Sequence, residues 1–163
     1  MSASPHIDPI VRRFIEDAGN ASQSLGAGRV IGQIYAFLYF SREPRCLADM
    51  QAVLGISKGG ASMSVRQLEQ WGAARRVWVH GDRKDYYEAN DWFGKIIKSM
   101  LTEAVGTKLG ALQRSLDAAE KELQDIEGNG ELTFVRDRVG RLRQFQSKAA
   151  KVWRNPVLQR LLK

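Results

Sequence analysis

Residues 55 to 66 read GISKGGASMSVR and place hydroxyl, cationic and glycine residues where a helical pattern begins. Ser57 is a good N-cap, because its hydroxyl can accept a hydrogen bond from a free backbone N–H of the first turn. Two glycines follow, although each costs about 1 kcal/mol relative to alanine inside a helix. Free N–H groups at a helix start, close to Lys58 and Arg66, are suited to phosphate. The stretch therefore favours binding of an anion.

The predicted helix over residues 57–72 has two different faces. Its apolar face repeats at helical spacing and holds Ala61, Val65, Leu68 and either Trp71 or Gly72. The candidate contacts lie elsewhere on the helix, and they are Ser57, Lys58, Gly59, Gly60, Ser62, Met63, Arg66 and Gln67. Two explanations of the glycines remain open. They either permit tight packing against another helix or let an outside partner approach the backbone closely.

The elements around this helix follow from periodicity and from breaker residues. Asp8 and Pro9 begin a short amphipathic helix, and the Gly- and Ser-rich stretch 19–28 is predicted to be a break. The elements expected next are a buried helix over 30–40, a break at 42–45, a helix over 47–55, the helix over 57–72, a strand over 74–81, a turn over 81–84 and a return strand over 85–89. A long helix over 91–127, a break at 128–130, an amphipathic helix from 132 and a short terminal helix after Pro156 complete the chain.

Three helices followed by a hairpin are typical of a winged helix-turn-helix, whose last helix enters the DNA major groove while the wing reaches the backbone or minor groove. In this arrangement Arg83 and Lys84 of the wing turn face the same partner as the 57–72 helix. Asp82 is predicted to orient Arg83 toward the minor groove. The predicted fold class is mainly α with a small β-hairpin wing and long dimerisation helices.

Three regions are expected on this basis. Residues 1–28 form an N-terminal helical arm that contacts a second copy, residues 29–90 form the DNA-binding domain, and residues 91–163 form a helical region for dimerisation and effector coupling. The long 91–127 helix offers more apolar surface than one small domain covers, which favours a dimer.

Three segments carry a resemblance to a known family. GRVIGQIYAFLYFS, LGISKGGASMSVRQLEQWG and GDRKDYYEA, in this order and spacing, resemble the GbsR branch of the MarR-type transcriptional regulators. The similarity covers roughly residues 12 to 100. It implies a homodimer that binds an imperfect palindrome in double-stranded DNA and usually represses. It also implies a small-molecule effector, a quaternary ammonium compound such as choline or glycine betaine, for which no binding residues can be matched.

The net charge of +7 favours an acidic partner, which is nucleic acid, an anionic membrane or an acidic protein. No apolar stretch approaches the roughly 20 residues that span a bilayer, and the N-terminus lacks a secretory signal pattern. We therefore expect no membrane partner and a cytoplasmic protein that is nucleoid-associated when bound to DNA. The competing class is a winged-helix protein-interaction module without specific DNA binding.

Few residues are available for catalysis or metal binding. The one cysteine excludes an intrachain disulfide, and His6 and His80 lack ligand partners at useful spacing. We find no nucleophile paired with a base and no phosphate-binding loop, so we predict no metal, no cofactor and no enzyme activity. Cys46 is interpreted as a small residue in a loop or at a helix start, with a redox sensor as the alternative.

Two further groups of residues have more than one interpretation. Residues 132–163 hold one acid, Asp137, and nine cations, which are Arg136, Arg138, Arg141, Arg143, Lys148, Lys151, Arg154, Arg160 and Lys163. These cations form a solvated face, contact the DNA backbone, or pair with an acidic face across a dimer. The larger aromatic residues are core residues or members of a cage for a quaternary ammonium ligand; they are Tyr35, Tyr39, Trp71, Trp78, Trp92 and Trp153.

Overall fold

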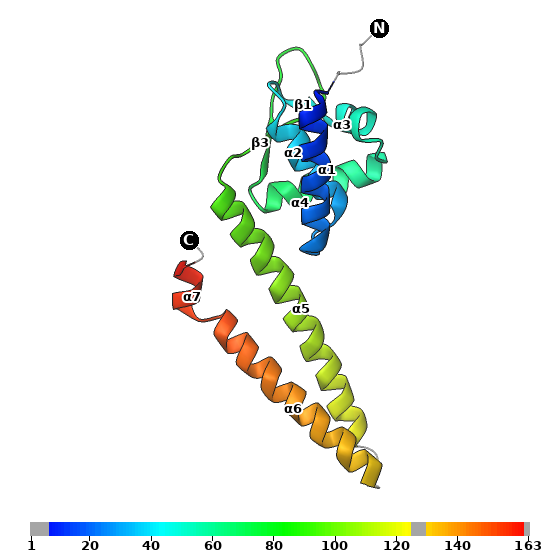
Figure 1. The fold of residues 1–163 in the computed structure, drawn as a ribbon, viewed down its shortest axis with the longest axis vertical. Helices are drawn as coiled ribbons and strands as arrows, with labels where there is room; N and C mark the ends of the chain where they lie inside the picture. The colour runs from blue at the N-terminus through cyan, green and yellow to red at the C-terminus, as the bar shows by residue number, and fades with distance from the viewer. Residues whose placement is uncertain (1–6, 125–129, 162–163) are drawn as a thin grey trace. The chain divides into compact units, whose positions relative to one another are not determined.

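The computed structural model describes residues 7–124 and 130–161, which fall into two compact units, Met1–Met100 and Leu101–Lys163 (Figure 1). The first unit contains α1 (Pro9–Ser24), α2 (Arg29–Tyr39), β1 (Arg45–Cys46), α3 (Leu47–Leu54), α4 (Lys58–Gln70), β2 (Ala74–Val77) and β3 (Tyr86–Ala89). Helix α5 (Phe93–Gln124) begins in the first unit and forms the second together with α6 (Gly130–Trp153) and α7 (Pro156–Leu161). The order of helices, hairpin and long helix confirms the predicted winged-helix fold class.

The core of the first unit is formed by α2, α3 and α4 around a few fully buried side chains. Ile34, Met50, Val65 and Leu68 are the largest of these. The apolar face predicted for the 57–72 helix is confirmed, and Trp71 continues it. The helix ends at Gln70, and the chain leaves it through Gly72, whose φ of +69° is readily adopted only by glycine. The prediction that the 30–40 helix is buried nearly all round is wrong at its end, where Tyr39 and Phe40 are each 42% exposed.

Helix α1 continues through the stretch that the sequence predicted to be a break. Residues 19–24 remain helical because Gly19 and Gly32 let α1 and α2 approach closely. A methyl group on Gly32 would overlap the backbone oxygen of Ala18, and one on Gly19 would lie 2.7 Å from Cγ of Gln33. The helix ends only after Ser24, and the chain then turns through Gly26 and Gly28, both with positive φ. These glycines of α1 and α2 are therefore contact points rather than breakers.

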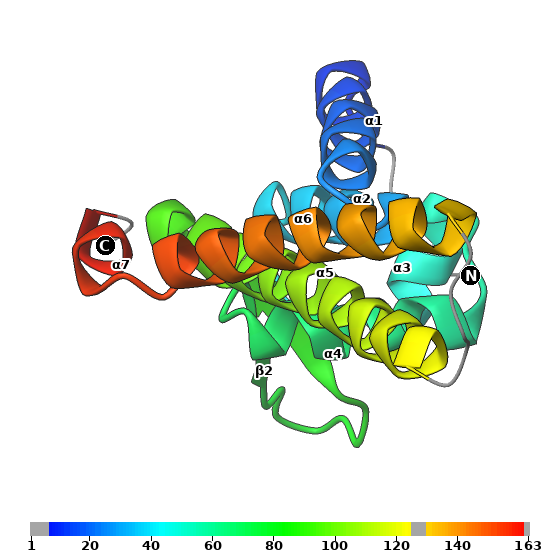
Figure 2. The same ribbon diagram turned by 90° about the horizontal axis from the view of Figure 1, so that it is seen from below.

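The sheet has three antiparallel strands in the order β1-β3-β2. Strand β1 was not predicted, because two residues are too few to show an alternating pattern. It pairs Arg45 with Tyr87 and Cys46 with Tyr86. The predicted 74–81 strand is too long, since β2 ends at Val77 and β3 starts at Tyr86. The wing between them, residues 78–85, is irregular and forms the loop that extends beyond β2 (Figure 2).

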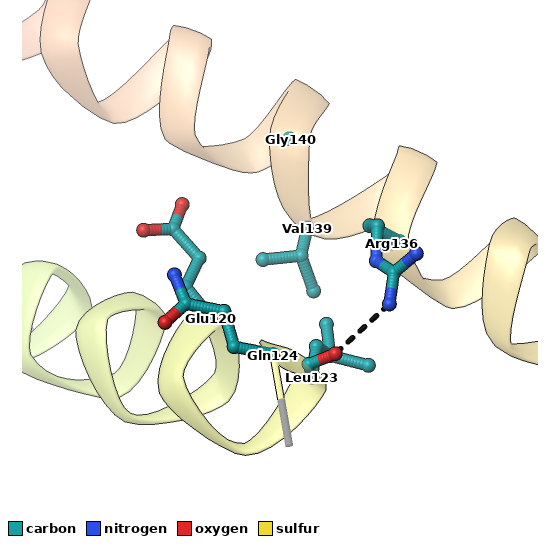
Figure 3. Close-up of a pocket in the computed structure, with 6 residues that line it drawn as sticks. All are labelled: Glu120, Leu123, Gln124, Arg136, Val139 and Gly140. Atoms are coloured by element: carbon teal, nitrogen blue, oxygen red, sulfur yellow. Dashed lines mark hydrogen bonds between the residues drawn. The ribbon is translucent and has the colours of Figure 1, made fainter. Parts of the chain in front are cut away.

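In the second unit the two long helices, α5 and α6, have opposite chain directions (Figure 1). Leu116 and Leu123 of α5 are buried, as are Gln146 and Ala150 of α6. Near the end of α5, Arg136 donates a hydrogen bond of 2.9 Å to the backbone oxygen of Leu123, and Val139 and Gly140 line the same pocket (Figure 3). The carboxyl end of α5 is thus partly satisfied by a side chain of α6.

Some predictions lie outside the described residues, and they concern His6, Lys163 and the break at residues 128–129. The short helix after Pro156 is confirmed, and the side-chain Oδ1 of Asn155 accepts a hydrogen bond from the Val157 N–H. Among the helices that are described, none is long and apolar enough to cross a membrane.

Candidate nucleic-acid interface

The start of α4 is open to solvent and is capped as the sequence predicted. The Ser57 hydroxyl accepts a hydrogen bond of 3.0 Å from the Gly60 N–H. Ser57, Lys58 and Gly59 are all exposed. The first N–H groups of a helix have no acceptor within it, so this end presents donors and a partial positive charge to solvent.

The two glycines of this turn do not pack against other parts of the described chain. A Cβ on Gly59 would meet nothing within 4 Å, and one on Gly60 would meet only the Ser57 hydroxyl, at 3.2 Å. Tight helix packing therefore does not explain these glycines within residues 7–124 and 130–161. The space above them is free for a partner from outside.

The next two turns of α4 continue the exposed face. Met63 is 73% exposed and Arg66 is exposed, while Ser62 and Gln67 are half-buried. The buried residues of these turns, which include Val65 and Leu68, hold the helix on the core. The face that the sequence assigned to a partner is thus the accessible face of α4.

The wing lies beside the start of α4. Lys58, Arg83 and Lys84 line one open groove of about 450 Å³. The other residues around it are Cys46, Leu47, Ala48, Gln51 and Asp85. Two cationic segments that are 25 residues apart in the sequence are therefore brought together at one groove, while Met63 and Arg66 lie farther along α4.

The cations of this surface differ in their ionic partners. Within the described chain, Lys58, Arg66 and Arg83 form no ion pair. Arg75 and Arg76 on β2, by contrast, pair with acids of the same unit: Arg75 with Glu88, and Arg76 with Glu69 and Asp85. The positive charge of α4 and the wing tip is thus available to an anion, whereas that of β2 is largely neutralised.

Asp82 shapes the turn of the wing. Its carboxylate accepts hydrogen bonds from the Lys84 N–H, at 3.0 Å, and the Tyr86 hydroxyl, at 2.8 Å, and it lies 3.7 Å from the Lys84 ammonium. The backbone hydrogen bond, with the one from Tyr86, lowers the pKa of Asp82, and the bond to Asp82 raises the pKa of Tyr86 to about 12. Asp82 therefore holds the turn backbone, which differs from its predicted role of aiming the Arg83 guanidinium.

The aromatic residues considered for a ligand cage have different surroundings. Trp71 belongs to the core, and Tyr35 donates a hydrogen bond of 2.9 Å to the Asn90 backbone oxygen. Burial raises the pKa of Tyr35 to about 12. Tyr39 packs near Tyr35 and Phe93. Trp78 stacks on His80 in the wing, and Trp92 lies beneath the Lys95 ammonium. Trp153 belongs to the second unit.

Cys46 is the N-cap residue of α3, and it is buried. Its backbone N–H donates a hydrogen bond of 2.9 Å to the Asp49 carboxylate. This agrees with the interpretation of Cys46 as a small residue at a helix start. The alternative of a redox sensor stays a prediction.

No family model matches the chain. It is 31% identical over 75 residues to the putative HTH-type transcriptional regulator YvaV of Bacillus subtilis, covering 46% of this chain and 42% of that protein. The HTH-type transcriptional repressor OpcR of the same organism is 26% identical over 122 residues, covering 74% of this chain and 65% of the repressor.

The chain is similar to HTH-type transcriptional regulators. MmpR5 of Mycobacterium tuberculosis, another regulator of this type, is 30% identical over 81 residues, covering 49% of each chain. The chain spans less than two thirds of the length of each of these relatives. A solved structure described as a transcriptional regulator matches with a TM-score of 0.62 at 24% identity, covering 94% of this chain and 96% of that one, which supports the fold. The prediction that the protein is not an enzyme agrees with these relatives.

Proposed function

We propose that the protein is a sequence-specific DNA-binding transcriptional regulator of the GbsR/MarR type, which represses as a homodimer on a palindromic operator. The observation that carries the proposal is the surface formed by α4 and the wing. At this surface the first turn of α4 contains two glycines, and no other part of the described chain covers Gly59. The same surface holds three cations, Lys58, Arg66 and Arg83, that form no ion pair within the described residues. The relatives named as regulators support it.

Each exposed residue of α4 has a role in this proposal. Arg66 has the length and fork geometry to donate two hydrogen bonds to O6 and N7 of guanine. Met63 supplies an apolar contact for a thymine methyl group, and Gln67 suits adenine. At the start of the helix Lys58 binds a phosphate together with the free N–H groups. Ser57 and Ser62 have hydroxyls for phosphates or bases, and Gly59 and Gly60 allow the close approach.

The wing completes the contact in the adjacent minor groove. Arg83 is exposed and enters that groove, where the negative potential is strong. Lys84, whose backbone is held by Asp82, binds a phosphate at the groove edge. A hairpin whose turn is fixed in advance loses less conformational entropy when it binds.

The homodimer is supported by a second apolar face on α6. Gln146 and Ala150 are buried in the second unit, but Val135, Leu142, Phe145 and Val152 are each at least 41% exposed. Their spacings of seven, three and seven residues are those of a coiled-coil seam. A second copy that covers this seam would create a two-fold dimer. Its reading helices would lie about 34 Å, or a multiple of this distance, apart on DNA.

The effector is proposed from the family resemblance alone. A quaternary ammonium compound such as choline or glycine betaine would change the separation of the two α4 helices in the dimer. The change would pass through α5, which connects the first unit to the α6 seam. Equal separations of the two α4 helices with and without the compound would contradict this step.

The proposed function is tested by fluorescence-anisotropy binding to the DNA upstream of the protein's own gene, across a salt series. We expect tight binding that falls with salt, and an Arg66→Ala variant that binds about 10- to 100-fold more weakly, which is the usual effect of losing one guanine contact. Arg75→Ala is the matched control, because Arg75 is an exposed arginine of the same unit that is already paired with Glu88.

Weak binding that is equal on random DNA and unchanged by Arg66→Ala would contradict the proposal. It would leave only attraction between a basic surface and an acidic polymer. A winged-helix module for an acidic protein partner would then become the better interpretation.

A further inference from the structure

The wing carries an unusually exposed tryptophan. Trp78 follows the end of β2 and is 78% exposed. It is the most exposed large hydrophobic side chain among those whose burial the structure describes, and Met63 of α4 follows at 73%. The two largest exposures thus fall on the two elements that the proposed function directs to DNA. Aromatic residues and methionine are enriched at binding interfaces relative to the rest of a protein surface.

The indole has an aromatic neighbour on the wing itself. The rings of Trp78 and His80 stack with centroids 5.4 Å apart and an angle of 30° between their planes. Neither residue belongs to the core, so the stack exists on the wing itself. A stacked partner restricts the rotamers of the indole, which reduces the entropy lost when it makes a contact.

The exposed charges of the wing favour a polyanion as the occupant of this surface. Arg83 and Lys84 are exposed on the same wing. The two wing carboxylates are engaged, Asp82 by the Lys84 N–H and the Tyr86 hydroxyl, and Asp85 by Arg76. A phosphate backbone that reaches the wing therefore meets an exposed apolar ring and two exposed cations on the same loop.

We propose that Trp78, supported by His80, packs against the sugars that line the minor groove entered by Arg83, and so contributes an uncharged, sequence-independent part of the DNA affinity. The inference rests on the proposed function and adds an uncharged contact to those that the cations make. Apolar side chains at minor-groove walls, and aromatic rings stacked on nucleotides, are established means of nucleic-acid binding.

The salt dependence separates this contact from an electrostatic one. Each phosphate neutralised by a cation contributes about 0.9 to the slope of log affinity against log salt concentration. Loss of an uncharged contact lowers affinity at every salt concentration and leaves that slope unchanged. Trp78→Ala is therefore expected to bind the upstream duplex about tenfold more weakly with the wild-type slope. Lys84→Ala is expected to reduce the slope by about 1.

A direct signal comes from intrinsic fluorescence during titration with the same unlabelled duplex. We expect quenching in the wild type that is largely lost in Trp78→Phe and retained in Trp92→Phe. Trp92 is the matched control because it is 61% exposed, belongs to the same unit and lies outside the wing. Circular dichroism melting of each variant shows that the fold is retained, as expected for side chains so exposed.

The possible failures can be told apart. If the wild type binds the duplex but Trp78→Ala binds equally well and Trp78→Phe is still quenched, the Trp78 contact is wrong and the proposed function stands. A reduced salt slope in Trp78→Ala would overturn the direct contact, because it would show that the indole only positions the cations. If the wild type binds no DNA, both proposals fail.

Discussion

The glycines at the α1–α2 contact and those at the start of α4 have opposite surroundings. A methyl group on Gly32 would collide with the α1 backbone at Ala18, and one on Gly19 would meet Gln33. A methyl group on Gly59 would point into open space. The first pair is required by the packing of the protein itself. The second costs helix stability without any packing benefit in the described chain, which is expected where the backbone must approach an outside partner.

The cations can also be divided into those bound to groups of the same unit and those without an ion pair in the described residues. The most basic segment of the sequence is 132–163, but several of its arginines are bound within their own unit. Arg143 pairs with Asp117 and Glu120, Arg141 pairs with Asp137, and Arg136 and Arg154 donate to backbone oxygens. Part of the positive charge of this segment is therefore used within its own unit. The α4 and wing cations are fewer, and Lys58, Arg66 and Arg83 among them form no ion pair within the described residues, while Lys84 lies near Asp82.

The largest expected effect concerns the internal glycines. Gly32→Ala should lower the free energy of unfolding by about 3 kcal/mol, because the added methyl group meets backbone that cannot move without separating α1 from α2. Urea denaturation followed by circular dichroism measures this change. A loss below about 1 kcal/mol would show that the two helices separate easily, and the contrast between the glycine pairs would be weakened.

Gly59→Ala is the matched substitution at the start of α4. Unlike Gly32→Ala, it should lower DNA affinity and not stability. The unfolding free energy should stay equal or rise by up to about 1 kcal/mol, since alanine is the better helix former. DNA affinity should fall about tenfold, corresponding to roughly 1.4 kcal/mol, because the methyl group would enter the gap between α4 and the duplex. Anisotropy and melting of the same preparation test both parts. Unchanged affinity would mean that close approach does not require this glycine.

Arg143→Ala should have the smallest effect, and only on stability. The hydrogen bond from Arg143 lowers the pKa of Glu120 below its usual 4.5. A carboxylate with a lowered folded-state pKa stabilises the fold above its unfolded pKa, and this stabilisation is lost as the pH falls through the folded pKa. The variant should therefore be slightly less stable than the wild type at neutral pH and equal to it at strongly acidic pH.

Denaturation at a series of pH values measures that difference, and DNA affinity at neutral pH is the second measurement. Affinity should be unchanged, because Arg143 is already occupied by two carboxylates. A loss of affinity as large as that of Arg66→Ala would place the α6 cations in the DNA contact. The contrast between the two basic regions would then be wrong.

Several features of the fold could be read from the sequence because neighbouring residues determine them. The Ser57 cap, the Ala61, Val65 and Leu68 face, and the helix ends at Gly55 and Gly72 follow from spacing and from backbone preferences within a few residues. The hairpin position followed from alternation on both sides of the GDRK turn. The exposed candidate residues of α4 were found because the opposite face of an amphipathic helix is determined once its buried face is known.

The tertiary structure decided the features that depend on residues far apart in the chain. The continuation of α1 to Ser24 depends on α2 lying against Gly19, and β1 exists only because Arg45 meets Tyr87. Local preference treats glycine as a breaker and two residues as too few for a strand, so neither feature could be inferred locally. The same holds for which cations are neutralised. Arg143 and Arg66 look alike in sequence, and only their spatial neighbours leave one paired and the other available, since electrostatic attraction depends on distance in space.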